Sequence, residues 1–204
     1  MRKESRMINT HRGRHWARTL LACGLLATWG GGSALAQTAW PTRTPVVSVE
    51  WLRGQLGNED LVLLHVGRED TYRGGHIAGA RFVPPGGISK RDAGPDALTL
   101  EMPDAEDLRK QLEDLGISDR SKVVVYFENI MIPPATRVVF TLDAAGLGDR
   151  VRLLDGGFPA WQRASYPTTS SAPEVIRGSL SALKMQPRIV DAKFVQEHLN
   201  SPGY

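Results

Sequence analysis

Two apolar runs constrain the fold of this chain more than any other feature of its sequence. They are LVLLHV (Leu61 to Val66) and KVVVYF (Lys122 to Phe127), and each is bounded by polar residues. An unbroken apolar run of this length is typical of a β-strand that is buried on both faces, as in a parallel sheet covered by helices. A third run, VRLLDGG at residues 151–157, predicts another strand that ends in a glycine turn.

Helical patterns lie between these runs. Residues 104–117, DAEDLRKQLEDLGI, have acidic residues in the first turn, leucines on one face and Gly116 at the end. Shorter helices are predicted at residues 49–56, from about 135 to 145 and at 159–164, and FVPPGG at residues 82–87 predicts an edge or short strand stopped by two prolines. Strands that alternate with helices predict an α/β fold with a parallel sheet flanked by helices.

Residues 1–36 have the features of a cleaved secretory signal. Six basic residues precede TLLACGLLATWGG, an apolar stretch too short to span a bilayer, and SALAQ supplies small residues for cleavage after Ala36. A buried or membrane-anchoring helix is the alternative, but three consecutive glycines interrupt the apolar stretch. We therefore expect a periplasmic or secreted protein.

Removal of this segment changes the net charge and the cysteine content of the chain. The full chain has a formal charge of +3, but the exported part keeps 19 basic and 21 acidic residues, so basicity does not indicate a nucleic-acid partner. No contact with a membrane is expected after cleavage. The only cysteine, Cys23, leaves with the signal, so the exported chain has no disulfide, no thiolate metal site and no cysteine nucleophile.

The carboxyl-terminal part of the sequence has the features of a linker followed by the start of a second domain. Residues 168–188 are rich in Ser, Thr, Ala and Pro, which is typical of a surface linker. The following RIVDAKFVQEHLNSPGY repeats the pattern of VVSVEWLRGQLGNED at residues 46–60, an apolar strand followed by an amphipathic helix. We expect residues 189–204 to be the truncated start of a second domain like the first.

Four stretches between residues 46 and 167 resemble the rhodanese family of sulfurtransferases. TYRGGHIAGARFVP resembles the family's E-Y-x-x-G-H-I-P-G-A element, and LVLLHVGRED precedes it at the expected distance. VVVYF and the later ATRVVFTLDAAGLGDRVRLLDGGFPAW resemble the family's strand, active-site helix and L-x-G-G-x-x-x-W turn. More narrowly, the chain resembles the amino-terminal half of two-domain thiosulfate or 3-mercaptopyruvate sulfurtransferases.

The resemblance implies sulfur transfer through a cysteine persulfide, with the nucleophilic cysteine in the second domain only. Such a cysteine needs a lowered pKa, which backbone N–H groups and a helix N-terminus provide in the family's C-x-x-G-x-R/T loop. Here Phe127 or Glu128 stands near the cysteine position, Asn129 follows, and Pro133 and Pro134 remove two amide donors. We expect no catalytic residue in this degenerate loop, and Glu128 to repel an anionic substrate.

Other residues of the family motifs are predicted to be structural. His76 and Gly79 belong to the tight turns of GGHIAGA, and the family pattern implies that Arg137 stabilises the loop or an interface to a second domain. Asp155 is interpreted as fixing backbone amides before Gly156 and Gly157, and Trp161 as a core residue. The family has D-x-R at the end of the second strand, where this chain has His-Val-Gly at residues 65–67 and Arg68 one place later. The usual polar contact between this turn and its neighbours is therefore in doubt.

These observations predict neither a cofactor nor a metal site, because His65, His76 and His198 lack the spacing of metal ligands. Two functions remain open. The chain is either the non-catalytic half of an exported sulfurtransferase, or a catalytically silent, exported rhodanese-like domain that binds a protein or a small sulfur-containing anion. The first function requires a second rhodanese domain as partner, in the same chain or as a separate one.

Overall fold

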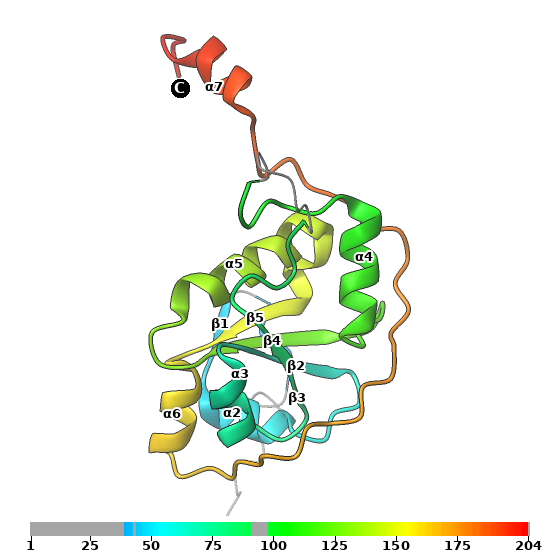
Figure 1. Ribbon diagram of the computed structural model, residues 1–204, viewed down its shortest axis with the longest axis vertical. Helices are drawn as coiled ribbons and strands as arrows, with labels where there is room; N and C mark the ends of the chain where they lie inside the picture. Colours follow the sequence, from blue (N-terminus) through cyan, green and yellow to red (C-terminus); the bar gives the residue numbers. More distant parts are fainter. Residues whose placement is uncertain (1–38, 43, 91–97, 204) are drawn as a thin grey trace, which may run out of the picture.

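A five-stranded parallel sheet forms the centre of the protein. The computed structural model describes residues 39–42, 44–90 and 98–203, so the predicted signal at residues 1–36 lies outside the described residues. The strand order is β1-β5-β4-β2-β3, and every pairing is parallel (Figure 1). The strands are β1 (Val46–Val47), β2 (Leu61–Val66), β3 (Ala80–Val83), β4 (Lys122–Phe127) and β5 (Val151–Leu154).

The two apolar runs of the sequence are the two strands that pair along their whole length. Leu61 lies opposite Lys122, and the register continues to Val66 opposite Phe127. β3 pairs with the other edge of β2, and β5 with the other edge of β4. Both strands are therefore covered by backbone partners at their edges and by helices on their faces, which confirms the predicted α/β fold and explains their unbroken apolar character.

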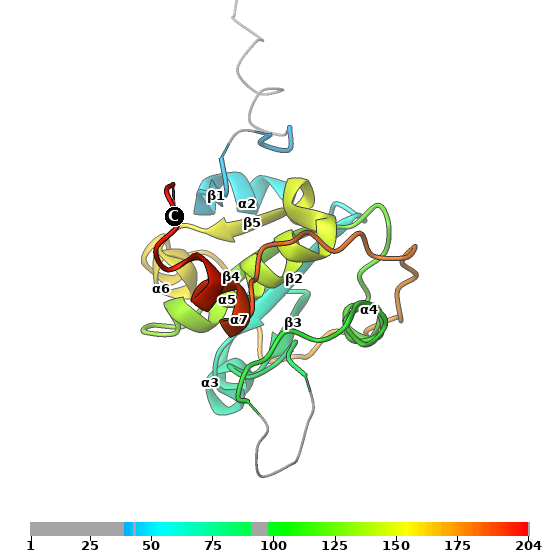
Figure 2. The ribbon, with the colours of Figure 1, turned by 90° about the horizontal axis from the view of Figure 1, so that it is seen from above.

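Alternating side chains of β2 and β4 enter two separate cores. Val62, Leu64 and Val66 face a core closed by α4 (Ala105–Asp114) and α5 (Ile132–Leu142). Leu63 and Tyr126 face a second core closed by α2 (Val49–Gln55) and α6 (Gly157–Arg163). Figures 1 and 2 show these helix pairs on opposite faces of the sheet.

Local sequence signals fix where the helices begin. The Ser48 side chain accepts a hydrogen bond from the Trp51 N–H at the start of α2, and Asp104 does the same for the Asp107 N–H at the start of α4. α5 begins at Ile132, earlier than the predicted position near residue 135, because proline is well tolerated in the first turn of a helix. A short helix, α3 (Glu69–Gly74), was not predicted.

The segment predicted to be a linker packs closely against α4. Residues 170–188 form neither helix nor strand, but Leu180 is buried in the core beneath α4 and α5. The Glu113 carboxylate accepts hydrogen bonds from the Leu180 N–H at 3.0 Å and from Arg177 Nη2 at 3.2 Å. The segment therefore completes the core of the domain, as its path beside α4 shows in Figure 1.

The carboxyl-terminal part forms a helix but no strand. Asp191 caps α7 (Ala192–His198) by accepting the Phe194 N–H at 2.7 Å. Ile189 and Val190, expected to form a strand, have no strand conformation and are exposed. α7 stands away from the sheet in Figure 1, so the apolar residues at this end, Ile189, Val190, Val195 and Leu199, are open to solvent.

Truncation of Leu180 should show that the segment after residue 167 is part of the folding unit. Leu180→Ala removes a side chain that is 6% exposed and leaves a cavity, so we expect a loss of about 2 to 4 kcal/mol in the free energy of unfolding. Ile176→Ala is the matched control, because Ile176 lies in the same segment and is 81% exposed. It should change stability by less than about 0.5 kcal/mol. Equal effects of the two substitutions in urea denaturation would contradict this assignment.

Candidate functional site

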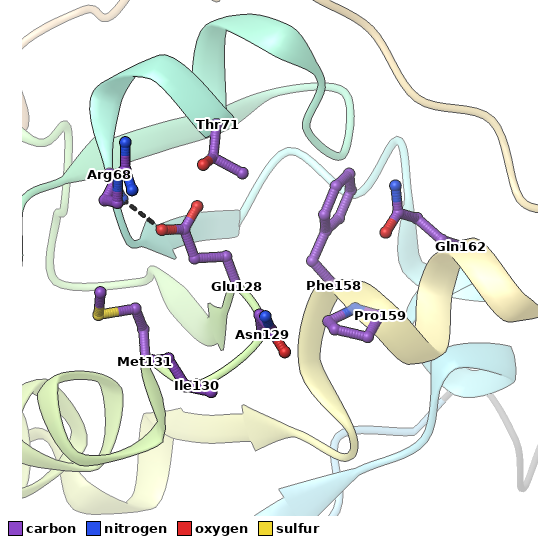
Figure 3. Close-up of a pocket in the computed structure, with 9 residues that line it drawn as sticks. All are labelled: Arg68, Thr71, Glu128, Asn129, Ile130, Met131, Phe158, Pro159 and Gln162. Carbon is purple, nitrogen blue, oxygen red and sulfur yellow. Dashed lines mark hydrogen bonds between the residues drawn. The ribbon is translucent and has the colours of Figure 1, made fainter.

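A pocket of about 480 Å³ lies at the carboxyl ends of the central strands. α3 follows β2, the loop of residues 128–131 follows β4, and α6 follows β5, and all three contribute side chains (Figure 3). Ligands in parallel α/β sheets bind at this edge. The lining residues are Arg68, Thr71, Glu128, Asn129, Ile130, Met131, Phe158, Pro159 and Gln162.

The loop after β4 offers neither a nucleophile nor an open ring of amide donors. It contains no cysteine, serine or histidine. The Glu128 N–H donates to Val66 O at 3.4 Å, and the Met131 N–H donates to Glu128 O at 2.8 Å. Pro133 and Pro134 occupy the first turn of α5, where they carry no N–H group. The amides that could hold an anion are therefore partly consumed and partly absent.

Glu128 turns into the protein instead of reaching into solvent. It is 6% exposed, and its Oε1 accepts a hydrogen bond from the Arg68 N–H at 2.8 Å (Figure 3). Gly67 makes room for this conformation, because a Cβ at residue 67 would lie 2.6 Å from Glu128 Cδ. The polar contact at the end of β2, which the sequence left in doubt, is thus supplied by Glu128 from the loop after β4.

A buried relay of polar side chains continues from Glu128 into the core. His65 is fully buried, and its Nε2 lies 3.7 Å from Glu128 Oε2. On the other side of the ring, His65 Nδ1 and the Tyr126 hydroxyl are 3.2 Å apart, and that hydroxyl accepts the Ile77 N–H at 3.2 Å. A phenol that accepts the Ile77 N–H still has its own proton to donate, and Nδ1 can accept that proton in the His65 tautomer that carries its ring proton on Nε2.

Burial determines the protonation of this relay. It lowers the pKa of His65 from 6.5 to about 4, against the attraction of Glu128, which raises it. Burial also raises the pKa of Tyr126, so the phenol keeps its proton. His65 is consequently neutral at pH 7 and does not provide a cation for Glu128. The sequence favoured an exposed or hydrogen-bonded histidine at this strand end over a catalytic base, and the ring is hydrogen-bonded and fully buried.

The remaining residues of the predicted motifs lie outside the pocket. His76 is fully buried and stacks on Tyr72 with 3.9 Å between ring centroids, and its Nδ1–H donates to Tyr72 O at 2.7 Å. Gly79 lies in the turn before β3. The Arg137 guanidinium donates to the carbonyl oxygens of Gly87, Ile88 and Leu100, and so holds both ends of the long excursion after β3. None of these contacts faces the pocket.

The turn after β5 positions α6 against the loop of β4. A Cβ at residue 157 would lie 2.6 Å from Phe127 O, so only glycine allows the two segments to approach so closely. Gly156, before it, has a φ of 64°. Asp155 is exposed, and it contributes its backbone N–H to Val47 O at 2.8 Å instead of the predicted side-chain contacts. Trp161 is fully buried and donates to Pro167 O at 2.9 Å.

Comparison with known proteins assigns the family. A model of the rhodanese-like domain matches residues 48–164, which is more than half of the chain. This chain belongs to the rhodanese-like domain family. The match begins at the cap of α2 and ends just after α6, so it covers the whole sheet except β1, together with the pocket.

Curated relatives of this rhodanese-like chain are sulfurtransferases. Thiosulfate/3-mercaptopyruvate sulfurtransferase 2 of Arabidopsis thaliana is 34% identical over 139 residues, which cover 64% of this chain and 39% of the relative. The mitochondrial thiosulfate/3-mercaptopyruvate sulfurtransferase 1 of the same plant is 32% identical over 166 residues, which cover 77% of this chain and 42% of the relative. The chain therefore spans about two fifths of the length of these relatives.

Solved structures share the fold. The crystal structure of SseA from Escherichia coli, described as a 3-mercaptopyruvate sulfotransferase, aligns with a TM-score of 0.65 at 24% identity, over 76% of this chain and 61% of that chain. The anaerobic ergothioneine biosynthesis enzyme from Chlorobium limicola aligns with a TM-score of 0.61 at 22% identity, over 80% of this chain and 43% of that chain. At these identities the likeness supports the rhodanese fold alone.

Within this fold, the pocket lies where the sequence resemblance places the family's cysteine loop. The sequence predicted that the loop is degenerate but missed that its glutamate is buried. The signal that could have shown this was Gly67 at the end of a buried strand, since an unexpected glycine there often marks a close approach by another chain segment.

The described residues contain neither a metal-binding cluster nor a helix that could span a membrane. Among residues 39–42, 44–90 and 98–203, no three His, Cys, Asp or Glu side chains are grouped so that they could hold a metal ion. Within the same ranges, no helix has both the length and the apolar character needed to cross a membrane.

Adding a methyl group at Gly67 should displace the Glu128 carboxylate. We expect Gly67→Ala to lower the free energy of unfolding by about 1 to 3 kcal/mol, because Cγ and Cδ of Glu128 must move away from the new Cβ. Gly54→Ala is the control, because Gly54 lies in α2 and a Cβ there would meet no atom within 4 Å. It should be neutral or stabilise by up to about 1 kcal/mol. A harmless Gly67→Ala in denaturant titrations would show that the carboxylate is not confined.

The depressed pKa of His65 predicts a loss of stability in mild acid. The unfolded chain binds a proton at His65 near pH 6.5, whereas the folded chain does so only near pH 4. The free energy of unfolding should therefore fall by about 2 kcal/mol between pH 7.5 and pH 5 through this group alone. The ring faces Glu128 on the loop after β4, Tyr72 on α3, Tyr126 on β4 and His76.

Comparison of variants isolates this contribution. His65→Gln should remove about 2 kcal/mol of the pH dependence, whatever its effect on absolute stability. Identical pH profiles of wild type and His65→Gln in urea unfolding would contradict the assignment.

Proposed function

We propose that this chain is an exported, non-catalytic rhodanese domain that acts as the partner of a cysteine-bearing rhodanese domain in a thiosulfate or 3-mercaptopyruvate sulfurtransferase. The observation that carries the proposal is the loop after β4, where a buried glutamate and two prolines stand in place of a thiol and its amide donors. Persulfide chemistry needs a thiolate, and the only cysteine of the chain lies in the predicted signal.

Two features support pairing with another domain. The chain corresponds to about two fifths of the plant sulfurtransferases, which leaves room in those proteins for a further domain. Beside the pocket, Ile130 and Ile132 are 76% and 48% exposed. Apolar side chains at the rim of a pocket favour a protein partner that covers them.

The predicted signal at residues 1–36 supports a periplasmic or secreted location.

The first function is tested by an assay of the chain without its signal. Residues 37–204, incubated with thiosulfate and cyanide, should form thiocyanate no faster than buffer alone, because no sulfur can be held as a persulfide. A cysteine-bearing relative serves as the positive control. Turnover by this cysteine-free chain would refute the thiolate argument.

The partnership is tested separately. The chain should form a complex with a cysteine-bearing rhodanese domain in sedimentation velocity, and substitution of Ile130 and Ile132 by Ser should weaken that complex. Failure of every cysteine-bearing rhodanese domain of the source organism to associate would leave only the second function.

The second candidate is a catalytically silent binding domain. The pocket itself favours it, because a hollow of about 480 Å³ with both polar and apolar walls persists although the sulfur chemistry is absent. The two functions do not exclude each other.

A further inference from the structure

We propose that the pocket between α3, α6 and the loop after β4 binds a cationic, ammonium-type group on an apolar stem, with the carboxylate of Glu128 as its counter-charge. This inference rests on the binding function proposed second above, and not on the pairing with a cysteine-bearing domain. It assigns to the pocket a ligand class opposite in charge to the sulfur-containing anions of the family.

The charges around the pocket support a cation. Of the nine lining residues, only Arg68 and Glu128 are charged. The Arg68 guanidinium forms an ion pair with Asp70, and it contributes only its backbone N–H to Glu128. The positive charge at the rim is thus already neutralised by an acid that does not line the pocket.

The Glu128 carboxylate lacks a cation among the described residues. Its Oε2 makes no hydrogen bond there, and the nearest basic side chain is His65, with Nε2 3.7 Å away. Because burial keeps His65 neutral at pH 7, the imidazole does not cancel the charge of the carboxylate. A buried carboxylate is costly unless a cation or several hydrogen bonds compensate it. Because Oε2 itself is closed to solvent, a cation in the pocket would compensate this charge through space and not by direct contact with Oε2.

The walls of the pocket fit the rest of such a ligand. Phe158 lies across the pocket from Glu128 in Figure 3, and the negative face of an aromatic ring attracts cations. Pro159, Ile130 and Met131 add apolar surface for a hydrocarbon stem, while Asn129 and Gln162 offer amide oxygens to N–H donors. The volume of about 480 Å³ suits a small amine or an inserted lysine side chain.

Part of the backbone after β4 cannot donate to an anion, which leaves mainly the side chains of Thr71, Asn129 and Gln162 as donors at the pocket. The Met131 N–H is bonded to Glu128 O, Pro133 and Pro134 have no N–H, and the nearest side chain of the loop is itself a carboxylate. Like charges repel strongly at short distance in a partly buried site. The arrangement thus selects against thiosulfate and for an ammonium group.

The test is a titration of residues 37–204, which include every described residue, followed by NMR of the backbone amides. The probes are n-butylammonium, its neutral counterpart n-butanol, and thiosulfate. We expect saturable shifts of amides in the pocket with n-butylammonium, at least tenfold weaker binding of n-butanol, and no saturable shifts in the pocket with thiosulfate.

Variants identify the counter-charge. Glu128→Gln keeps an oxygen for the Arg68 N–H but removes the charge, and should weaken n-butylammonium binding at least tenfold. Glu69→Gln is the control, because Glu69 is an exposed acid on α3 that does not line the pocket, and should change binding less than twofold. If Glu128→Gln does not fold, the comparison of n-butylammonium with n-butanol in the wild type still decides the question.

Each outcome separates this inference from the proposed functions. A fourth probe, Nα-acetyl-lysine amide, keeps a free ε-ammonium group. Tighter binding of this probe than of n-butylammonium identifies a partner's lysine as the source of the cation, and the reverse identifies a free amine; both support the inference. Saturable thiosulfate binding in the pocket overturns it but leaves the binding function standing. Equal affinity for n-butylammonium and n-butanol overturns the inference, and so does equal affinity of wild type and Glu128→Gln for n-butylammonium. If no probe binds, the binding function is overturned as well.

Discussion

The pairing of β2 with β4 is the interaction on which the rest of the structure depends. These strands are flanked by other strands at both edges, so their side chains feed both cores and their backbone groups are satisfied within the sheet. Their carboxyl ends also define the site, because His65 and Val66 lie opposite Tyr126 and Phe127 at the edge where the pocket opens. The same register brings His65, Tyr126 and Glu128 into one relay.

Glu128 links the architecture to the chemistry of the site. This chain has a carboxylate near the position where the rhodanese resemblance places a thiolate. The carboxylate accepts a hydrogen bond from the Arg68 N–H, and the neutral imidazole of His65 lies 3.7 Å from it. The change from a nucleophile to a buried carboxylate is supported by Gly67, which has no side chain to obstruct it. The proposed lack of sulfur chemistry and the proposed binding of a cation thus rest on the same local arrangement.

The fold could be predicted from the sequence to a large extent. The bounds of β2 and β4 followed from their apolar runs, and the acidic first turn predicted the start of α4 to within one residue of Ala105. α3 could not be predicted, because its six residues carry no apolar periodicity and no side-chain cap. The segment after residue 167 was taken for a linker from its composition, yet Leu180 is buried through contacts with α4 and α5, which lie far away in the sequence.

By itself the sequence determined the α/β class, the family and the absence of a thiol from residues 37–204, because these depend on residue types and on local periodicity. It also determined that two prolines weaken the amide cradle at the start of α5. Only the tertiary structure decided that Glu128 points inward, that His65 is buried and neutral, and that the pocket is bounded by α3 and α6. Those properties depend on the approach of segments some 60 residues apart, and the free energies of burial and of charge that control them arise only when the chain has folded.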